Sequence, residues 1–128
     1  MNVLLDTHIA LWAITDSPRL PKQAFELISN PKNTIWVSVA TIWEIAIKFA
    51  LGRGDMPVSS QDALHYFQQS GYKILAIEAE HVIAAGALPI HHQDPFDRVL
   101  IGQALTEPMR LMTHDRLVAK YSNTIILV

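Results

Sequence analysis

Apolar and polar residues follow one another along the chain in blocks that fit strands and helices in turn. Short, continuously apolar or β-branched runs predict buried strands, because a strand covered on both faces needs no polar side. The expected strands cover 3–5, 34–37, 72–77, 111–113 and 123–128. Apolar residues at helical spacing predict helices at about 7–15, 21–29, 39–51, 60–69, 78–88, 95–105 and 116–120.

This alternation of strands and helices predicts the fold class. Strands that alternate with helices favour a mostly parallel sheet with right-handed crossovers. We expect one α/β domain over 1–128, with four to five strands in a sheet between helices on both faces. The stretch 52–60 is the only one that resembles a linker.

Composition narrows the class of protein further. The chain has 128 residues, 50% of them hydrophobic, which is enough for one core, and it has no cysteine, so thiolate metal sites are excluded. A net charge of −2 argues against a protein that coats nucleic acid by bulk electrostatics. Neither a secretory leader nor a long apolar run is visible, so we expect a cytoplasmic protein without a membrane span.

Four acids occupy similar places in the predicted elements. Asp6, Glu44, Asp97 and Asp115 each lie at a junction between elements or within about two turns of one. In a parallel α/β protein these junctions gather at one edge of the sheet, so the four carboxylates are expected to meet. Several carboxylates in one place need a cation, and oxygen ligands suit Mg²⁺ or Mn²⁺. The hypothesis is a metal-dependent phosphoryl-transfer site.

Each acid also has an ordinary structural explanation. Asp6 and Asp115 are suited to start helices, and Asp97 fits a capping box with Asp94. Glu44 has Lys48 four residues on, the spacing of a surface ion pair. The joint placement of all four acids favours function over these explanations taken singly.

The histidines permit a different metal site. His91, His92 and His114 are candidate zinc ligands. Their spacing matches neither a His-x-x-x-His nor a His-x-Glu signature, so a polar loop is the preferred interpretation.

Four strings around these residues resemble the PIN-domain nucleases, and within them the VapC-type toxins of bacterial toxin–antitoxin pairs. The strings are LLDTHIALWA, VSVATIWEIAIKFALGR, LPIHHQDPFDRVLIGQAL and LMTHD, and together they span nearly the whole chain in order. The resemblance implies a PIN-like three-layer sandwich that carries four acids at the carboxyl edge of its sheet. It also implies cleavage of RNA with Mg²⁺ or Mn²⁺. Gly102 stands where the family more often has alanine, a difference we expect to affect helix packing only.

Carried over by motif, the resemblance makes Asp6, Glu44, Asp97 and Asp115 the metal-binding and catalytic set. Thr7 and Thr113 match hydroxyl positions beside it, and Asp94 is a further supporting candidate. We expect Arg98 and Lys48, which lie near the acids in sequence or helical phase, to contact phosphate.

The resemblance also implies partners. VapC-type toxins form homodimers and are inhibited by a small antitoxin whose basic side chain can enter the acidic site. We expect a homodimer that binds such a partner along its first helices, with one cation of the partner near Asp6 and Asp97. Exposed apolar patches usually mark interfaces, and the candidates for such a surface are Trp12, Trp36 and Trp43; the alternative is that all three tryptophans lie in the core.

Two other functions fit the sequence less well. A receiver-like phosphoacceptor domain has similar length and alternation, but this chain lacks the acceptor after the third strand and the lysine after the fifth. A catalytically silent PIN-like scaffold that only binds RNA or protein stays an alternative, although all four acids are present.

Overall fold

The computed structural model describes residues 1–52 and 56–128, so the expected linker at 52–60 lies partly outside the described residues. The strands are β1 (Asn2–Leu5), β2 (Thr34–Ser38), β3 (Lys73–Leu75), β4 (Arg110–Thr113) and β5 (Ile126–Leu127). The helices are α1 (Thr7–Ile14), α2 (Lys22–Ser29), α3 (Val39–Ala50), α4 (Ser60–Gln69), α5 (Ala79–Gly86), α6 (Pro95–Thr106) and α7 (Arg116–Ala119). The predicted order of elements is therefore confirmed.

The strands form one parallel sheet in the order β3-β2-β1-β4-β5. This confirms the predicted parallel sheet. The central strand β1 pairs with β2 through Val3 and Ile35 and with β4 through Leu4 and Leu111. The two edge strands are shorter than expected, because only Lys73–Leu75 and Ile126–Leu127 keep their pairing with the single neighbour that an edge strand has.

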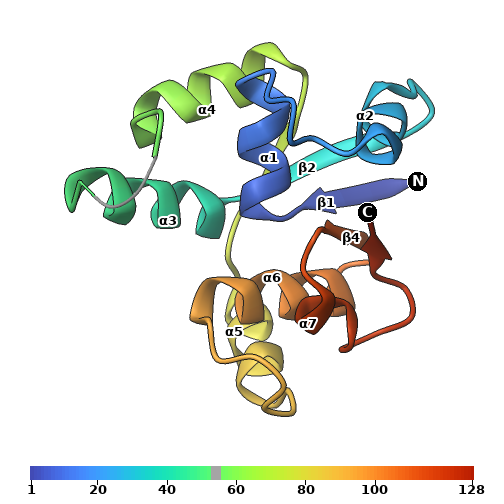
Figure 1. Cartoon of the computed structure of the whole chain (residues 1–128). Coiled ribbons are helices and arrows are strands. Elements are labelled where there is room, and N and C mark those ends of the chain that lie inside the picture. Colours follow the sequence, from blue (N-terminus) through green and yellow to red (C-terminus); the bar gives the residue numbers. More distant parts are fainter. Residues whose placement is uncertain (53–55) are drawn as a thin grey trace.

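Helices cover both faces of the sheet, as predicted. In Figure 1, α1, α2 and α4 lie on one side of the strands, and α5, α6 and α7 lie on the other. Two cores result. One contains Val3, Leu5 and Phe67 of α4, and the other contains Leu4 and Leu100 of α6. Successive residues of β1 enter opposite cores because strand side chains alternate between faces.

Gly102 allows α6 to approach α5 closely. A Cβ atom at this position would lie 2.6 Å from the carbonyl oxygen of His81 and 2.9 Å from the amide nitrogen of Ala85. Such distances are too short for an alanine unless the helices separate. The glycine therefore has the packing role expected from the sequence.

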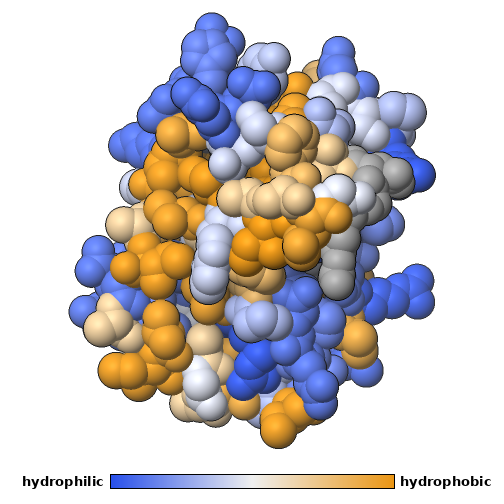
Figure 2. Space-filling model, turned by 90° about the vertical axis from the view of Figure 1, so that its left-hand side faces the viewer, coloured by the Kyte–Doolittle hydropathy of each residue, from blue (hydrophilic) through white to orange (hydrophobic). Residues whose placement is uncertain are grey.

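The tryptophans differ in exposure. Trp12 and Trp36 are half-buried against the two cores, whereas Trp43 on α3 is 58% exposed. Val39, four residues before Trp43 on α3, and Leu51, the C-cap of this helix, are also exposed, and these three residues are called the apolar stripe of α3. Figure 2 shows several apolar patches, separated by hydrophilic side chains, on one side of the molecule.

Across residues 1–52 and 56–128, no helix has the length and apolar character required to cross a bilayer.

Candidate active site

The carboxyl ends of β1 and β4 lie at the topological switch point, where the direction in which strands are added to the parallel sheet reverses. From β1 the chain adds β2 and β3 on one side, and later β4 and β5 on the other. In open α/β sheets, ligands bind in the crevice outside such a switch point. Asp6 follows β1 directly. Thr113 is the last residue of β4, and Asp115 comes two residues later.

Asp6 is a buried carboxylate that serves the local structure as well. It is the N-cap of α1, and its Oδ1 accepts a hydrogen bond from the Ile9 amide at 2.9 Å. Its Oδ2 accepts a hydrogen bond from the Thr113 hydroxyl, which ties the ends of β1 and β4 together. The side chain is 5% exposed, and this burial raises the pKa of Asp6 above its ordinary value, although the hydrogen bond from Thr113 opposes the shift.

Glu44 points inward from α3 and is held on both oxygens. Oε1 accepts a hydrogen bond from the Thr7 hydroxyl at 2.7 Å, and Oε2 pairs with Lys48 Nζ at 2.6 Å. Glu44 is only 4% exposed, whereas Lys48 keeps contact with solvent. The ion pair considered from the sequence therefore exists, but it lies at a buried carboxylate and not on the surface.

Asp97 lies in the first turn of α6, whose N-cap is Asp94. Asp94 Oδ1 accepts hydrogen bonds from the amides of Phe96 and Asp97, so the predicted helix start is confirmed. The carboxylate of Asp97 pairs with His92, with Nε2 2.7 Å from Oδ2, a contact that a simple capping role does not require.

The negative charges of three other acids affect the pKa of Asp97. Burial raises the pKa of Asp97 to about 6, and the negative charges of Asp94, Asp6 and Glu44 add to the rise, while the hydrogen bond with His92 opposes it. Asp6 after β1, Glu44 in the middle of α3 and Asp97 in the first turn of α6 are thus close enough for their negative charges to oppose one another. Such a set is stabilised by a cation.

Asp115 lies at the rim of this group. Its Oδ1 accepts a hydrogen bond from the Leu117 amide and so caps α7, while its Oδ2 is 4.0 Å from His92 Nε2. Its side chain is 41% exposed, far more than that of Asp6 or Glu44.

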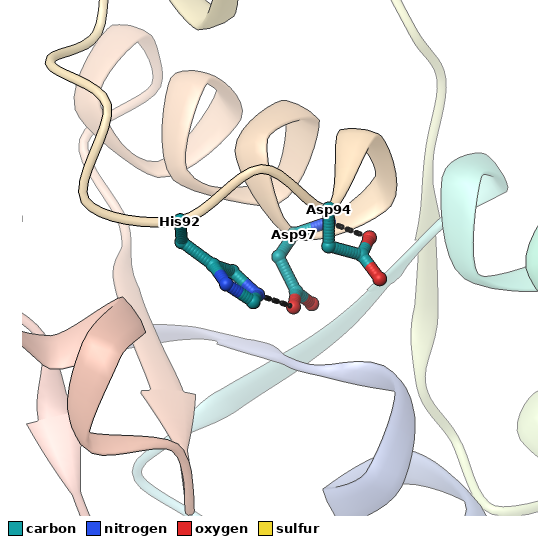
Figure 3. A group of neighbouring side chains, drawn as sticks. All are labelled: His92, Asp94 and Asp97. Carbon is teal, nitrogen blue, oxygen red and sulfur yellow. Dashed lines mark hydrogen bonds and ion pairs between the residues drawn. The ribbon is translucent and has the colours of Figure 1, made fainter.

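His92, a candidate zinc ligand for which a polar loop is the preferred interpretation from the sequence, lies on the loop before α6 and beside the acids. One ligand atom from each of His92, Asp94 and Asp97 lies within 4.8 Å of the others, and among the described residues this is the group of three or more that fits a metal ion. Figure 3 shows the imidazole pointing at Asp97 from the loop before α6. The available signal in the sequence was a histidine two residues before a helix cap. His91 and His114 make other contacts, with Tyr121 and with Trp12 and Val128.

Arg98 binds backbone and is not poised for phosphate. Its guanidinium donates hydrogen bonds to the carbonyl oxygens of Ala85, Leu88, Pro89 and His92. These contacts fix the loop that carries His92. The expected phosphate contact is therefore not supported, and Arg98 acts through the loop.

The donor set suits a hard divalent ion. Burial raises the pKa values of Asp6 and Asp97. The protein alone therefore stabilises their negative charges poorly. Oxygen ligands of this kind are preferred by Mg²⁺ and Mn²⁺. The residues therefore fit the metal that the resemblance implies.

An all-parallel sheet with acids at its switch point defines an α/β protein with a polar site at the carboxyl edge. The family model of the PIN domain matches residues 3–123, so the chain belongs to the PIN-domain family. A search of curated proteins found no significant match.

Solved structures share the fold. VapBC2 from Rickettsia felis, bound to a DNA fragment from its promoter, superposes with a TM-score of 0.69 at 20% identity, covering 100% of this chain and 98% of that chain. DNA-bound VapBC from Salmonella typhimurium gives 0.68 at 17% identity, with 100% and 97% covered. FitAcB from Neisseria gonorrhoeae gives 0.65 at 16% identity, with 98% and 96% covered. These likenesses confirm the predicted PIN-like architecture.

The receiver-like alternative is wrong. Receiver domains have the strand order 2-1-3-4-5, whereas this sheet has the order β3-β2-β1-β4-β5.

Proposed function

We propose that the protein is a Mg²⁺- or Mn²⁺-dependent endoribonuclease and the toxin of a toxin–antitoxin pair. The observation that carries the proposal is the burial of Asp6 and Glu44 on adjoining segments, since Asp6 directly precedes Thr7, whose hydroxyl donates to Glu44 Oε1 at 2.7 Å. The negative charges of both acids also raise the pKa of Asp97. Membership of the PIN-domain family and the likeness of the fold to VapBC structures support it further.

Each acid has a role in the proposed reaction. Asp6 and Asp97 would hold the ion, with Asp115 at the rim as a further ligand. A bound ion would neutralise charge on the scissile phosphate and lower the pKa of water. Glu44, already fixed by Thr7 and Lys48, would orient the attacking water by accepting its proton in a hydrogen bond.

Two threonines position these acids. Thr113 donates to Asp6 and Thr7 donates to Glu44, so each hydroxyl holds one carboxylate in a fixed orientation. Fixed ligands reduce the reorganisation needed when substrate binds. Thr7 and Thr113 are thus proposed as positioning residues, together with Asp94 at the cap of α6.

We further propose a homodimer that binds a small antitoxin in the cytoplasm. The exposed apolar stripe of Val39, Trp43 and Leu51 supports a protein interface. The uncompensated charge at Asp6 and Asp97 would attract an arginine or lysine of the antitoxin, so the same charges would serve catalysis and inhibition.

Incubation with RNA tests the proposal against the silent scaffold. Purified protein is mixed with total RNA, with and without Mg²⁺, and new ends are mapped by sequencing. We expect discrete cleavage sites that depend on the ion. Binding of RNA without new ends under any divalent ion would favour the scaffold.

A further inference from the structure

His92 faces two acids from the loop between α5 and α6. Its Nε2 atom lies 2.7 Å from Asp97 Oδ2 and 4.0 Å from Asp115 Oδ2, while its side chain is 21% exposed. The imidazole is half-buried and points at the Asp97 carboxylate, as a metal ligand beside Asp97 would (Figure 3).

The loop holds His92 in this place through its backbone. The Tyr121 hydroxyl accepts hydrogen bonds from the amides of His91 and His92 at 3.0 and 2.8 Å, and it donates to the Pro89 carbonyl at 2.8 Å. Arg98 donates to the carbonyl oxygens of Pro89 and His92 at 3.1 and 3.2 Å. With both its amide and its carbonyl fixed, His92 starts from a defined position, which is what a metal ligand requires.

We propose that His92 is a nitrogen ligand of the ion held by Asp97 and makes the site prefer Mn²⁺ over Mg²⁺. This rests on the proposed function, because that function puts the ion at Asp97. The hydrogen bond joins His92 Nε2 and Asp97 Oδ2 at 2.7 Å, and both are atom types that can ligate a metal ion, so one ion placed beside Asp97 would also be within reach of the imidazole. Mg²⁺ is bound through oxygen ligands and keeps several of its waters. Mn²⁺ also suits oxygen ligands, but it belongs to the first-row divalent ions that bind sites containing nitrogen, so an imidazole among the carboxylates favours Mn²⁺ over Mg²⁺.

The competing role for His92 is an outer contact that only orients Asp97. Ligating carboxylates are commonly hydrogen-bonded by a second group in this way. The two roles differ in a measurable manner. A ligand nitrogen couples magnetically to Mn²⁺ and favours one ion, whereas an outer contact affects the binding of both ions equally.

Pulsed electron spin resonance of the Mn²⁺-loaded protein tests the proposal. We expect a nitrogen hyperfine coupling in the wild type and in His65→Gln, a control that removes an exposed histidine on α4. The coupling should be lost in His92→Gln. Its absence from the wild type, or its persistence in His92→Gln, would overturn the proposal, and the wild-type measurement needs no variant to fold.

Calorimetric titration with each ion supplies the second readout. His92→Gln should weaken Mn²⁺ binding about tenfold and change Mg²⁺ binding much less. Equal losses for both ions would assign His92 the orienting role and overturn its role as ligand, while leaving the metal site at Asp97 intact. Mn²⁺ binding that Asp97→Asn does not weaken would instead contradict the proposed function itself.

Discussion

The Thr7 hydroxyl lies 2.7 Å from Glu44 Oε1 and joins residues 37 positions apart, so the start of α1 and the middle of α3 share one buried hydrogen bond. Thr7 Oγ1 also lies 3.2 Å from Thr41 Oγ1. This small polar group is enclosed by apolar core, where an unpaired carboxylate oxygen is costly.

Thr7→Val should therefore lower the free energy of unfolding by about 1–3 kcal/mol, because it leaves Glu44 Oε1 without its donor. Urea denaturation measures the loss. Thr7→Ser keeps the hydroxyl and should stay within about 1 kcal/mol of the wild type. A Thr7→Val variant that loses no more stability than Thr7→Ser would show that the hydrogen bond to Glu44 contributes little.

The raised pKa of Asp97, about 6, predicts a pH dependence of stability in the metal-free protein. Between the ordinary carboxyl pKa and about 6, the folded state binds more protons than the unfolded state, so stability falls as pH rises through this window. The expected contribution is about 1–3 kcal/mol.

Asp97→Asn removes this titrating group and isolates its effect. Urea denaturation in EDTA at about pH 4 and about pH 7.5 should show the variant gaining stability relative to the wild type at the higher pH. An identical pH dependence for both proteins would contradict the raised pKa.

Gly102→Ala should destabilise the fold by about 1–3 kcal/mol, because its Cβ would lie 2.6 Å from the His81 carbonyl oxygen. Gly86→Ala is the matched control, since a Cβ there meets nothing within 4 Å, and it should be neutral or stabilising by up to about 1 kcal/mol. Thermal unfolding distinguishes the two. A Gly102→Ala variant as stable as Gly86→Ala would show that α5 and α6 separate readily.

Local patterns predicted most of the elements, since each is decided by neighbouring residues. Asp94-Pro95 specifies the start of α6, and the apolar run Val3 to Leu5 specifies a strand buried on both faces. The edge strands were overestimated because the number of paired residues depends on the neighbouring strand, which the sequence of 72–77 or 123–128 does not contain.

The site was predictable only where spacing and motif carried the information. Asp6 and Glu44 lie beside recognisable apolar runs, and their burial agrees with a shared site. The position of His92 beside Asp97 depends on Tyr121, 29 positions away, and on Arg98. The charge of Arg98 suggested a contact with phosphate, whereas its guanidinium binds backbone carbonyl oxygens. Such long-range contacts leave no periodic signal in the sequence.

The dimer proposal predicts that Trp43→Glu weakens self-association, because it puts a charge in the exposed apolar stripe of α3. Light scattering across a dilution series should show a wild-type dimer at micromolar concentration and a dissociation constant at least about tenfold higher for the variant. Ile83→Glu, on α5 and 72% exposed, is the control and should leave the dimer intact. A wild-type monomer at micromolar concentration would remove the dimer claim.

The rate of RNA cleavage by Asp6→Asn tests the central claim most directly. The substitution keeps the shape of a buried side chain and removes its charge. The control, Asp16→Asn, changes an exposed acid at a positive φ of 54°, which asparagine tolerates. We predict that the wild type and Asp16→Asn cleave RNA with Mn²⁺, that EDTA stops both, and that Asp6→Asn is slower by about 10²-fold or more. Cleavage by Asp6→Asn at the wild-type rate, or undiminished cleavage in excess EDTA, would contradict a metal-dependent carboxylate site.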